Sequence, residues 1–394
     1  MSPLERRSSV SLALIFALRM LGLFLVLPVF ALEARHLPGG DNPALVGLAM
    51  GIYGLTQGCL QMVYGMASDR MGRKRVIVFG LLVFAIGSFA AALAETLPGL
   101  VAGRALQGAG AVSAAVTALL ADQTRDSVRT KAMALVGASI GLVFALSLVL
   151  SPLLNGWIGL HGIFTLTGVL ALGGMAVVQW LVPAETRAHA ALPARHALVE
   201  VLRNPALLRL NYGVFVLHAV QLGMWMAIPA LLVEAGLPKE AHWQVYLPAV
   251  LGSFFVMGGT LFPLERRGYL RAVFLFAIGL IASVQLALWY FSALHPSVFT
   301  LGVVLFVFFW GFNILEASQP SLASRLAPAA VRGTALGVYN TLQSLGFFAG
   351  GAVGGWLVKS VGARGLFSVC GAAMLLWLAV AWRMQTPSRT KDAP

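Results

Sequence analysis

Charged side chains are scarce in this sequence. Asp, Glu, Lys and Arg make up only 10% of its 394 residues, whereas 59% are hydrophobic. Soluble domains contain about 25% charged residues, so the composition excludes a soluble globular protein. In place of a charged surface, the chain offers a succession of apolar stretches of about 20 residues, the length that an α-helix needs to cross a bilayer.

Cysteine is also scarce, and no other reactive cluster replaces it. Cys59 and Cys370 both lie in apolar stretches, without the spacing of a disulfide framework or a metal site. The sequence has no nucleotide-binding loop, metal-ligand cluster or nucleophile triad. We therefore expect neither an enzyme nor a bound cofactor or metal.

The apolar stretches predict twelve membrane-spanning helices. The run after Arg6 and Arg7 is too long for a signal peptide and lacks a small-residue cleavage site, so we interpret it as the first retained span. Breaks at charged residues, proline and glycine divide the rest of the chain. The predicted spans lie near residues 11–33, 43–66, 75–94, 98–121, 131–155, 161–182, 207–233, 243–264, 270–292, 297–318, 333–358 and 363–383.

Basic residues are distributed unevenly between the two sides of these spans. The formal net charge of +13 could by itself indicate a nucleic-acid partner. With the N-terminus inside, however, 21 Lys and Arg residues fall on the inner segments and only four on the outer segments. The positive-inside rule then predicts that both termini are cytoplasmic. We expect the lipid bilayer as a partner, and no nucleic acid.

The longest polar segment, residues 184–206, lies midway along the chain. It divides a predicted N-terminal bundle of six helices, residues 1–183, from a C-terminal bundle of six, residues 207–394, and forms a cytoplasmic linker. Weak internal echoes support two related halves: residues 69–72 (Asp-Arg-Met-Gly) resemble residues 265–268 (Glu-Arg-Arg-Gly). Transporters are commonly built from such repeats, with the substrate site between them.

Two motifs identify a family. Residues 65–75 match the pattern G-x-x-x-D-R-x-G-R-K/R-x between two spans, and residues 104–110 match R-x-x-Q-G-x-G within the fourth span. Both resemble signatures of the major facilitator superfamily. Residues 18–22 and 26–29 of the first span are similar to its drug/proton antiporter branch.

This resemblance implies an all-α membrane protein of the bacterial inner membrane. Two pseudo-symmetric six-helix bundles would surround a central cavity and alternate between outward-open and inward-open states. It also implies the proton gradient as energy source, and a transporter that works as a monomer. In the fifth span the chain departs from the exporter pattern, because Ser151-Pro152 replaces a Gly-Pro pair. This departure leaves the direction of transport open.

Three charged residues fall deep in predicted spans, where charge is costly and usually faces a pathway or a partner. Glu316 is the acid best placed to bind a proton or a cationic substrate, or it lies near a helix end in water. Arg104 matches the arginine that the family links to proton coupling; otherwise it satisfies backbone carbonyls of the first span. Arg19 either counters Glu316 or an anionic substrate, or holds helices together. His218 is a further, weaker proton-site candidate.

A cytoplasmic latch is the role that the family motif implies for Asp69, Arg70, Arg73 and Asp122. A helix N-terminus attracts an acid, so Asp69 near the start of the eleventh span would favour the inward-closed state. Alternatively, these charged residues only set the membrane topology and form no latch.

Polar and aromatic side chains at helical spacing are candidates for lining the cavity. Any one of them could instead hold helices together. The candidates are Tyr53, Gln57, Gln61, Gln107, Gln221, Trp225, Asn313, Tyr339, Asn340 and Gln343.

The predicted function is proton-driven export of a small amphipathic or drug-like molecule. Protonation of Glu316, assisted by Arg104, would be coupled to substrate release. A symporter or facilitator for a sugar or other metabolite in the same fold is the first alternative. A transporter-like receptor that moves no solute is the second.

Overall fold

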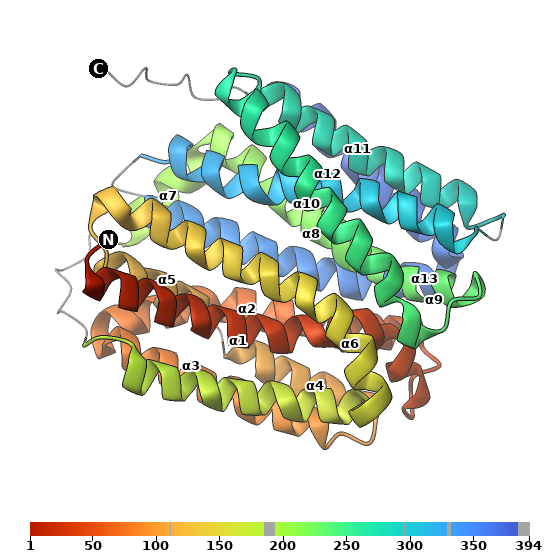
Figure 1. Cartoon of the computed structure of the whole chain (residues 1–394), viewed down its shortest axis with the longest axis horizontal. Coiled ribbons are helices and arrows are strands. Elements are labelled where there is room, and N and C mark those ends of the chain that lie inside the picture. Colours follow the sequence, from red (N-terminus) through yellow and green to blue (C-terminus); the bar gives the residue numbers. More distant parts are fainter. Residues whose placement is uncertain (111, 185–193, 295, 329–331, 385–394) are drawn as a thin grey trace.

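The computed structural model describes residues 1–110, 112–184, 194–294, 296–328 and 332–384. The helices run side by side along one axis, with those of the first half gathered apart from those of the second (Figure 1). In the first half these are α1 (Pro3–Glu33), α2 (Pro43–Met71), α3 (Arg73–Ala92), α4 (Leu97–Ala109), α5 (Ser113–Asp122) and α6 (Asp126–Ala176), which continues as the π-helical turn η2 (Val177–Leu181). After α7 (Ala194–Arg203), the second half contains α8 (Pro205–Trp225), α9 (Ile228–Glu234), α10 (Trp243–Arg266), α11 (Leu270–Phe291), α12 (Val298–Leu326) and α13 (Arg332–Ala381).

Local sequence signals start several of these helices. Asn42 and Asn204 precede Pro43 and Pro205, and each asparagine side chain accepts a hydrogen bond from an amide of the first turn. An Asn cap satisfies an amide that the helix leaves unpaired, and proline at the first position loses nothing because its nitrogen would have no partner there. Ser2 and Glu5 form a reciprocal capping box at the start of α1.

The described helices form twelve segments long enough to span a membrane. Nine apolar helical stretches among the described residues are long enough to span a bilayer, and two of them are 47 and 48 residues long, about twice the needed length. α6 bends at Gly159 and α13 at Gly362, so each makes two crossings. The consecutive α4 and α5 supply the remaining one. The predicted all-α fold of twelve spans is confirmed.

The two bends add an element to the repeat between the halves that the sequence analysis did not identify. Gly159 and Gly362 have nearly the same backbone angles, with φ of 65° and 69° and ψ of −179° and −177°. This left-handed region is open mainly to glycine. The surrounding sequences are Gly-Leu-His-Gly-Ile-Phe over 159–164 and Gly-Ala-Arg-Gly-Leu-Phe over 362–367. The last two helices of each half are therefore joined by the same tight turn without a loop.

We call the end of the bundle where α1 begins and α13 finishes the basic end, and the other the opposite end. Figure 1 shows the start of α1 and the finish of α13 at one end of the molecule. Arg73, Lys74 and Arg125 lie at the turns of this same end. The opposite end contains the turns at Gly159 and Gly362 and the segment between α9 and α10.

Helices α2 and α13 form a seam between the halves that is tight only toward the opposite end. A Cβ atom added to Gly47 would lie 2.2 Å from the carbonyl oxygen of Gly351, and one added to Gly54 would lie 2.4 Å from that of Ser344. At Gly58 the nearest atoms are already 3.4 Å away, and at Gly337, nearer the basic end, nothing lies within 4 Å. The helices therefore touch backbone to backbone at one end and separate toward the other.

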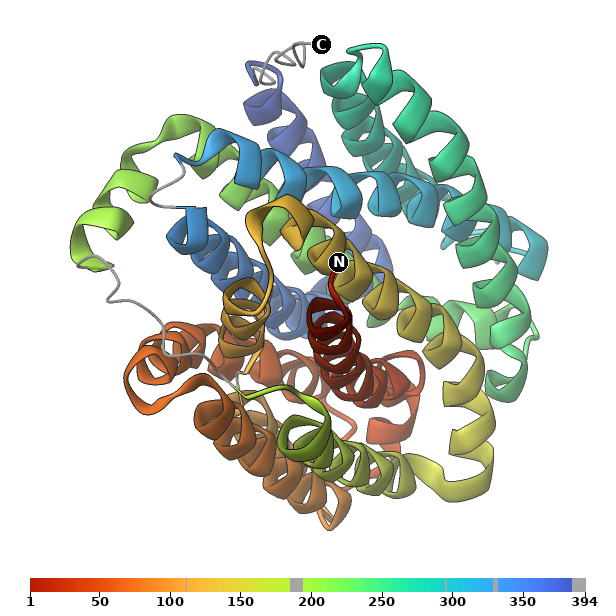
Figure 2. The same ribbon diagram turned by 60° about the vertical axis from the view of Figure 1, so that its left-hand side comes forward.

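Polar contacts close the opposite end as well. Glu33, at the end of α1, forms an ion pair with Lys239 of the short 3-10 helix η3 (Lys239–Ala241) in the second half. The amide of Asn155 on α6 donates to the same Glu33 carboxylate at 2.9 Å. The two halves are thus joined at the opposite end, and the seam widens toward the basic end. Figure 2 shows the molecule with the basic end turned toward the viewer.

Candidate functional site

Three polar side chains from α8, α12 and α13 meet in the interior of the second half. His218 Nε2 lies 3.3 Å from Glu316 Oε2, and the Gln343 side-chain nitrogen lies 2.8 Å from His218 Nε2 and 3.4 Å from Glu316 Oε1. Glu316 stands ten residues before the end of α12, about 15 Å along the helix axis. We call these three residues the His218 cluster.

The contacts of the imidazole fix where protons can be. His218 Nδ1 lies 2.8 Å from the carbonyl oxygen of Val214, and a carbonyl only accepts hydrogen bonds, so Nδ1 carries a hydrogen. The other ring nitrogen faces the Glu316 carboxyl group. An unprotonated Nε2 and an ionised carboxylate would oppose two lone pairs at 3.3 Å. A proton on Nε2 or on Oε2 would join the two groups by a hydrogen bond. Nε2 also has the Gln343 side-chain nitrogen 2.8 Å away. An amide nitrogen only donates, so a neutral imidazole accepts this hydrogen bond, and a protonated Nε2 requires the Gln343 amide to turn its oxygen toward the ring.

The two partners differ sharply in exposure. Only 2% of the His218 side chain is exposed, against 41% of that of Glu316. The rings of Phe312 and Phe347 lie against the imidazole, edge to face, at 6.0 and 4.8 Å between centroids. Glu316 Oε2, the oxygen nearest the imidazole, is itself buried and has no hydrogen-bond partner among the described residues. The imidazole and the oxygen that faces it are thus both out of solvent, while the rest of the Glu316 side chain is accessible.

A second polar cluster, around Arg19, lies in the first half. The Arg19 guanidinium donates to Ser113 Oγ at 2.6 Å, to the Tyr53 hydroxyl at 2.7 Å and to Gln57 Oε1 at 3.1 Å. All these acceptors are neutral, and no acidic partner of Arg19 lies among the described residues. With 2% of the residue exposed, Arg19 is a buried charge that no described counter-ion neutralises. It does not contact Glu316, which was one of its expected partners.

Gln57 connects the two clusters across the seam. Its amide nitrogen donates to Ser344 Oγ on α13 at 3.3 Å. Ser344 follows Gln343 directly in the sequence, so a polar path runs from Arg19 through Gln57 to the neighbour of the His218 cluster. The sequence analysis missed Ser344 and Ser113; helical spacing from Gln343 and Arg19 contains no signal that would have found them.

Arg104 has a different surrounding from the one expected. Its guanidinium donates to the backbone carbonyls of Ala49 at 3.3 Å and Met50 at 3.2 Å, both on α2, and to Gln107 Oε1 at 2.7 Å. Arg104 thus satisfies backbone carbonyls, as one interpretation predicted, but these belong to α2 and not to the first span, because α4 packs against α2. Buried carbonyls need donors, and Arg104 joins α4 to α2.

Only part of the predicted latch can be described. Arg73 Nε lies 3.1 Å from Asp122 Oδ2, linking the start of α3 to the end of α5 at the basic end. The side chains of Asp69 and Arg70 lie outside the described residues. The latch as a whole stays a prediction.

The remaining cavity candidates do not form one site. Asn313 donates to Ser253 of α10 at 2.9 Å, and Trp225 packs on Tyr246 with ring centroids 5.1 Å apart. Both contacts lie within the second half. Tyr339 donates to Gln319 Oε1 at 3.3 Å. Gln61 and Gln221 are buried, each with a side-chain oxygen that has no hydrogen-bond partner among the described residues, while Asn340 is half-buried.

Comparisons with known proteins agree with this architecture. The family model of the Major Facilitator Superfamily matches residues 12–351 and 271–394. The inner membrane transport protein YajR of Escherichia coli K12 is 42% identical over 98% of this chain and 85% of its own length. The multidrug resistance protein MdtH of Yersinia enterocolitica is 26% identical over 86% of this chain and 83% of its own length.

Solved structures share the fold. The human organic anion transporter MFSD10 superposes with a TM-score of 0.69 over 96% of this chain and 100% of its own, at 18% identity. An auto-inhibited peptide transporter of the POT family reaches 0.73 over 98% and 99%, at 14% identity. The relatives are transporters and not enzymes, as predicted. Two bundles around a polar interior, the match over nearly the whole chain and the similarity to YajR show that this protein is a membrane-spanning transporter of the Major Facilitator Superfamily.

Proposed function

We propose that this transporter exports a small amphipathic or drug-like molecule in exchange for protons. The observation that carries the proposal is the His218 cluster, in which an interior carboxyl group with 41% of its side chain exposed faces a buried imidazole at 3.3 Å. The more distant similarity to MdtH, which is named a multidrug resistance protein, supports the class of substrate.

The cluster suggests how proton and substrate would exclude each other. With a proton between Glu316 and His218, the carboxyl group is satisfied and carries no free charge toward the interior. Removal of that proton leaves a carboxylate with 41% of its side chain open to the space that a cationic substrate would occupy. A cationic group would then compensate the charge that the proton had compensated. One site that holds either a proton or a cation, but not both, yields exchange.

The arrangement of the two ends supports an access route. The His218 cluster lies on the side from which the seam spreads, whereas glycine contacts and the Glu33–Lys239 ion pair close the opposite end. The basic residues of the inner segments would place the basic end in the cytoplasm of a bacterial inner membrane. This state would then be inward-open, ready to receive a molecule from the cell. Rocking of the halves would carry it across.

The test is substrate-triggered proton movement in proteoliposomes that contain a pH indicator and an imposed proton gradient. A panel of cationic and neutral amphipathic compounds is added to wild type, to Glu316→Gln, and to Glu95→Gln as a control. Glu95 is an exposed acid at the turn between α3 and α4, so the control loses the same charge away from the interior.

We expect efflux of protons in wild type and in Glu95→Gln, and its loss in Glu316→Gln, because glutamine cannot carry the exchanged proton. Substrate movement that ignores the gradient, or that runs with it, would instead support the facilitator or the symporter. Efflux that Glu316→Gln retains in full would remove the His218 cluster from the proton path.

A further inference from the structure

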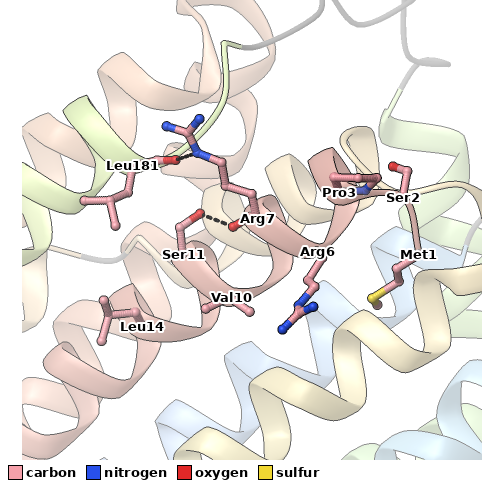
Figure 3. Close-up of a pocket in the computed structure, with 9 residues that line it drawn as sticks. All are labelled: Met1, Ser2, Pro3, Arg6, Arg7, Val10, Ser11, Leu14 and Leu181. Carbon is pink, nitrogen blue, oxygen red and sulfur yellow. Dashed lines mark hydrogen bonds between the residues drawn. The ribbon is translucent and has the colours of Figure 1, made fainter.

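A pocket of about 520 Å³ lies at the basic end, between the first turns of α1 and the end of η2. Its size is within the range of small-molecule sites, about 300 to 1,000 Å³. Arg6, Arg7, Val10, Leu14 and Leu181 contribute to its lining, as Figure 3 shows. The pocket is distant from the His218 cluster, and the transport proposal makes no use of it.

The position of the pocket is at the level where a membrane meets water. Arg7 donates from Nε to the carbonyl oxygen of Leu181 at 2.9 Å and from an NH2 group to that of Trp180 at 3.3 Å. These are the last carbonyls of η2, so the guanidinium caps that helix end. Trp180 is 74% exposed, and exposed tryptophans are enriched at the interface between lipid and water.

The charge in the pocket is positive and uncompensated. The Arg6 side chain makes no hydrogen bond or ion pair with the described residues, and Figure 3 shows its guanidinium turned away from that of Arg7. The nearest acid in the sequence, Glu5, is engaged elsewhere, because Arg125 binds its two carboxylate oxygens at 2.8 and 3.2 Å. That contact raises the pKa of the Arg125 guanidinium. Glu5 therefore leaves both arginines available to an external anion.

Apolar side chains continue from the charged part of the pocket along one face of α1. Val10 is 51% exposed and Leu14 39%, and Leu181 on the facing wall is 45% exposed. Positions 7, 10 and 14 follow one another on the same side of a helix. A ligand that fits this surface carries a negative head and an apolar chain directed toward the middle of the bilayer.

We propose that this pocket binds an anionic phospholipid of the surrounding leaflet, with its anionic head group between Arg6 and Arg7, whose guanidinium groups point to opposite sides, and one acyl chain along Val10 and Leu14. Arginine binds phosphate through paired hydrogen bonds, and Arg7 keeps its second NH2 group free for this contact. Basic pockets between helices on the cytoplasmic side suit such head groups.

Native mass spectrometry of the full chain in detergent tests the proposal. Phosphatidylglycerol and phosphatidylcholine with identical acyl chains are titrated into wild type, Arg6→Gln and the double variant Arg6→Gln/Arg7→Gln. Arg267→Gln is the matched control, because Arg267 is an exposed arginine at the same end in the second half. The single variant Arg6→Gln separates lipid binding from folding, because Arg6 caps no helix and its loss leaves the fold of η2 intact.

We expect preferential retention of phosphatidylglycerol by wild type, a loss of that preference of about fivefold in Arg6→Gln and about 30-fold in the double variant, and no change in Arg267→Gln. Equal retention by wild type and the double variant would overturn the proposal. So would an equal loss in Arg267→Gln, which would indicate an unspecific effect of charge. Glycerol 3-phosphate is added as a competitor. If it displaces bound phosphatidylglycerol when present at the same concentration as the lipid, the pocket binds a soluble phosphate, and the proposal of a lipid site is overturned.

Discussion

The two ends of the seam between α2 and α13 use opposite kinds of contact. Toward the opposite end, glycines bring the backbones so close that a methyl group added to Gly47 would meet a carbonyl oxygen at 2.2 Å. Toward the basic end, Gly337 has nothing within 4 Å. There the ion pairs among the described residues join Arg73 to Asp122, Arg125 to Glu5 and Arg325 to Glu265, each within one half. The closed end is thus joined across the halves by close backbone contact and by the Glu33–Lys239 ion pair, whereas the open end keeps these ion pairs inside each half.

The difference shows where the free energy of alternating access is located. Contacts between the halves exist in one state only, so they set the balance between states. Contacts within a half persist through rigid-body rocking and leave that balance nearly unchanged. Variants along the seam should therefore differ in effect according to which end they alter.

The largest effect is expected for Gly47→Ala. Overpacking typically costs about 1 to 3 kcal/mol, and here the cost falls only on the state with the opposite end closed. The ratio of the two states should shift about 5- to 150-fold toward opening of that end. Asp41 and Ser360 are exposed on either side of the seam. Both are changed to cysteine and spin-labelled, and double electron–electron resonance measures the distance between the two labels. Cys59 is exposed and is first changed to serine.

Gly337→Ala is the control for this experiment, because the added methyl group enters open space. Its distance distribution should match that of the parent. A shift equal to that of Gly47→Ala would mean that alanine acts through helix propensity and not through contact at the seam. A second label pair at Arg75 and Pro328, both exposed, follows the basic end in both variants.

A smaller effect is expected for Lys239→Gln. The Glu33 and Lys239 side chains are 17% and 36% exposed, and partly exposed ion pairs contribute about 0.2 to 1 kcal/mol. The population with the opposite end open should rise about two- to fivefold at most. The same label pair at Asp41 and Ser360 measures it. The reversed pair Glu33→Lys/Lys239→Glu should restore the parental distribution; failure of the reversal would point to the hydrogen bond of Asn155 to Glu33 as the main contact.

The smallest effect is expected for Asp122→Asn. The variant removes the ion pair with Arg73 at 3.1 Å, but both residues belong to the first half. The population with the opposite end open, read from the distance distribution of the same label pair, should change by less than about twofold. A larger change would show that charge at the basic end acts across the seam, and the comparison between the two ends would then need to be redrawn.

The sequence predicted the spans well because apolar length and glycine or proline breaks are local properties. The predicted spans 131–155 and 161–182 divide at the bend of α6, and those at 333–358 and 363–383 divide at the bend of α13. The repeated Gly-x-x-Gly-Ile/Leu-Phe pattern at Gly159 and Gly362 was present in the sequence. It would have indicated the related turns, had it been recognised.

Pairings between helices could not be predicted. Glu316 and His218 were separate candidates, and nothing in their spacing shows that α8 and α12 bring them within 3.3 Å. One of the two interpretations of Arg104 placed it on carbonyls of the first span, but it reaches carbonyls on α2. Trp225 has helical spacing with His218 and Gln221, yet it packs on Tyr246. Periodicity selects a face of one helix, whereas tertiary packing decides what lies opposite that face.

The turns at Gly159 and Gly362 also determine what a binding protein could recognise. Helices that reverse direction at one glycine expose almost no peptide at those two turns, so the continuous peptide of the opposite end lies mainly after α1 and between α9 and α10. An antibody or nanobody that also covers the two glycine turns binds a conformational epitope composed of several turns. Because those turns belong to both halves, such a reagent would distinguish the closed arrangement from the open one, and could trap the transporter in a single state.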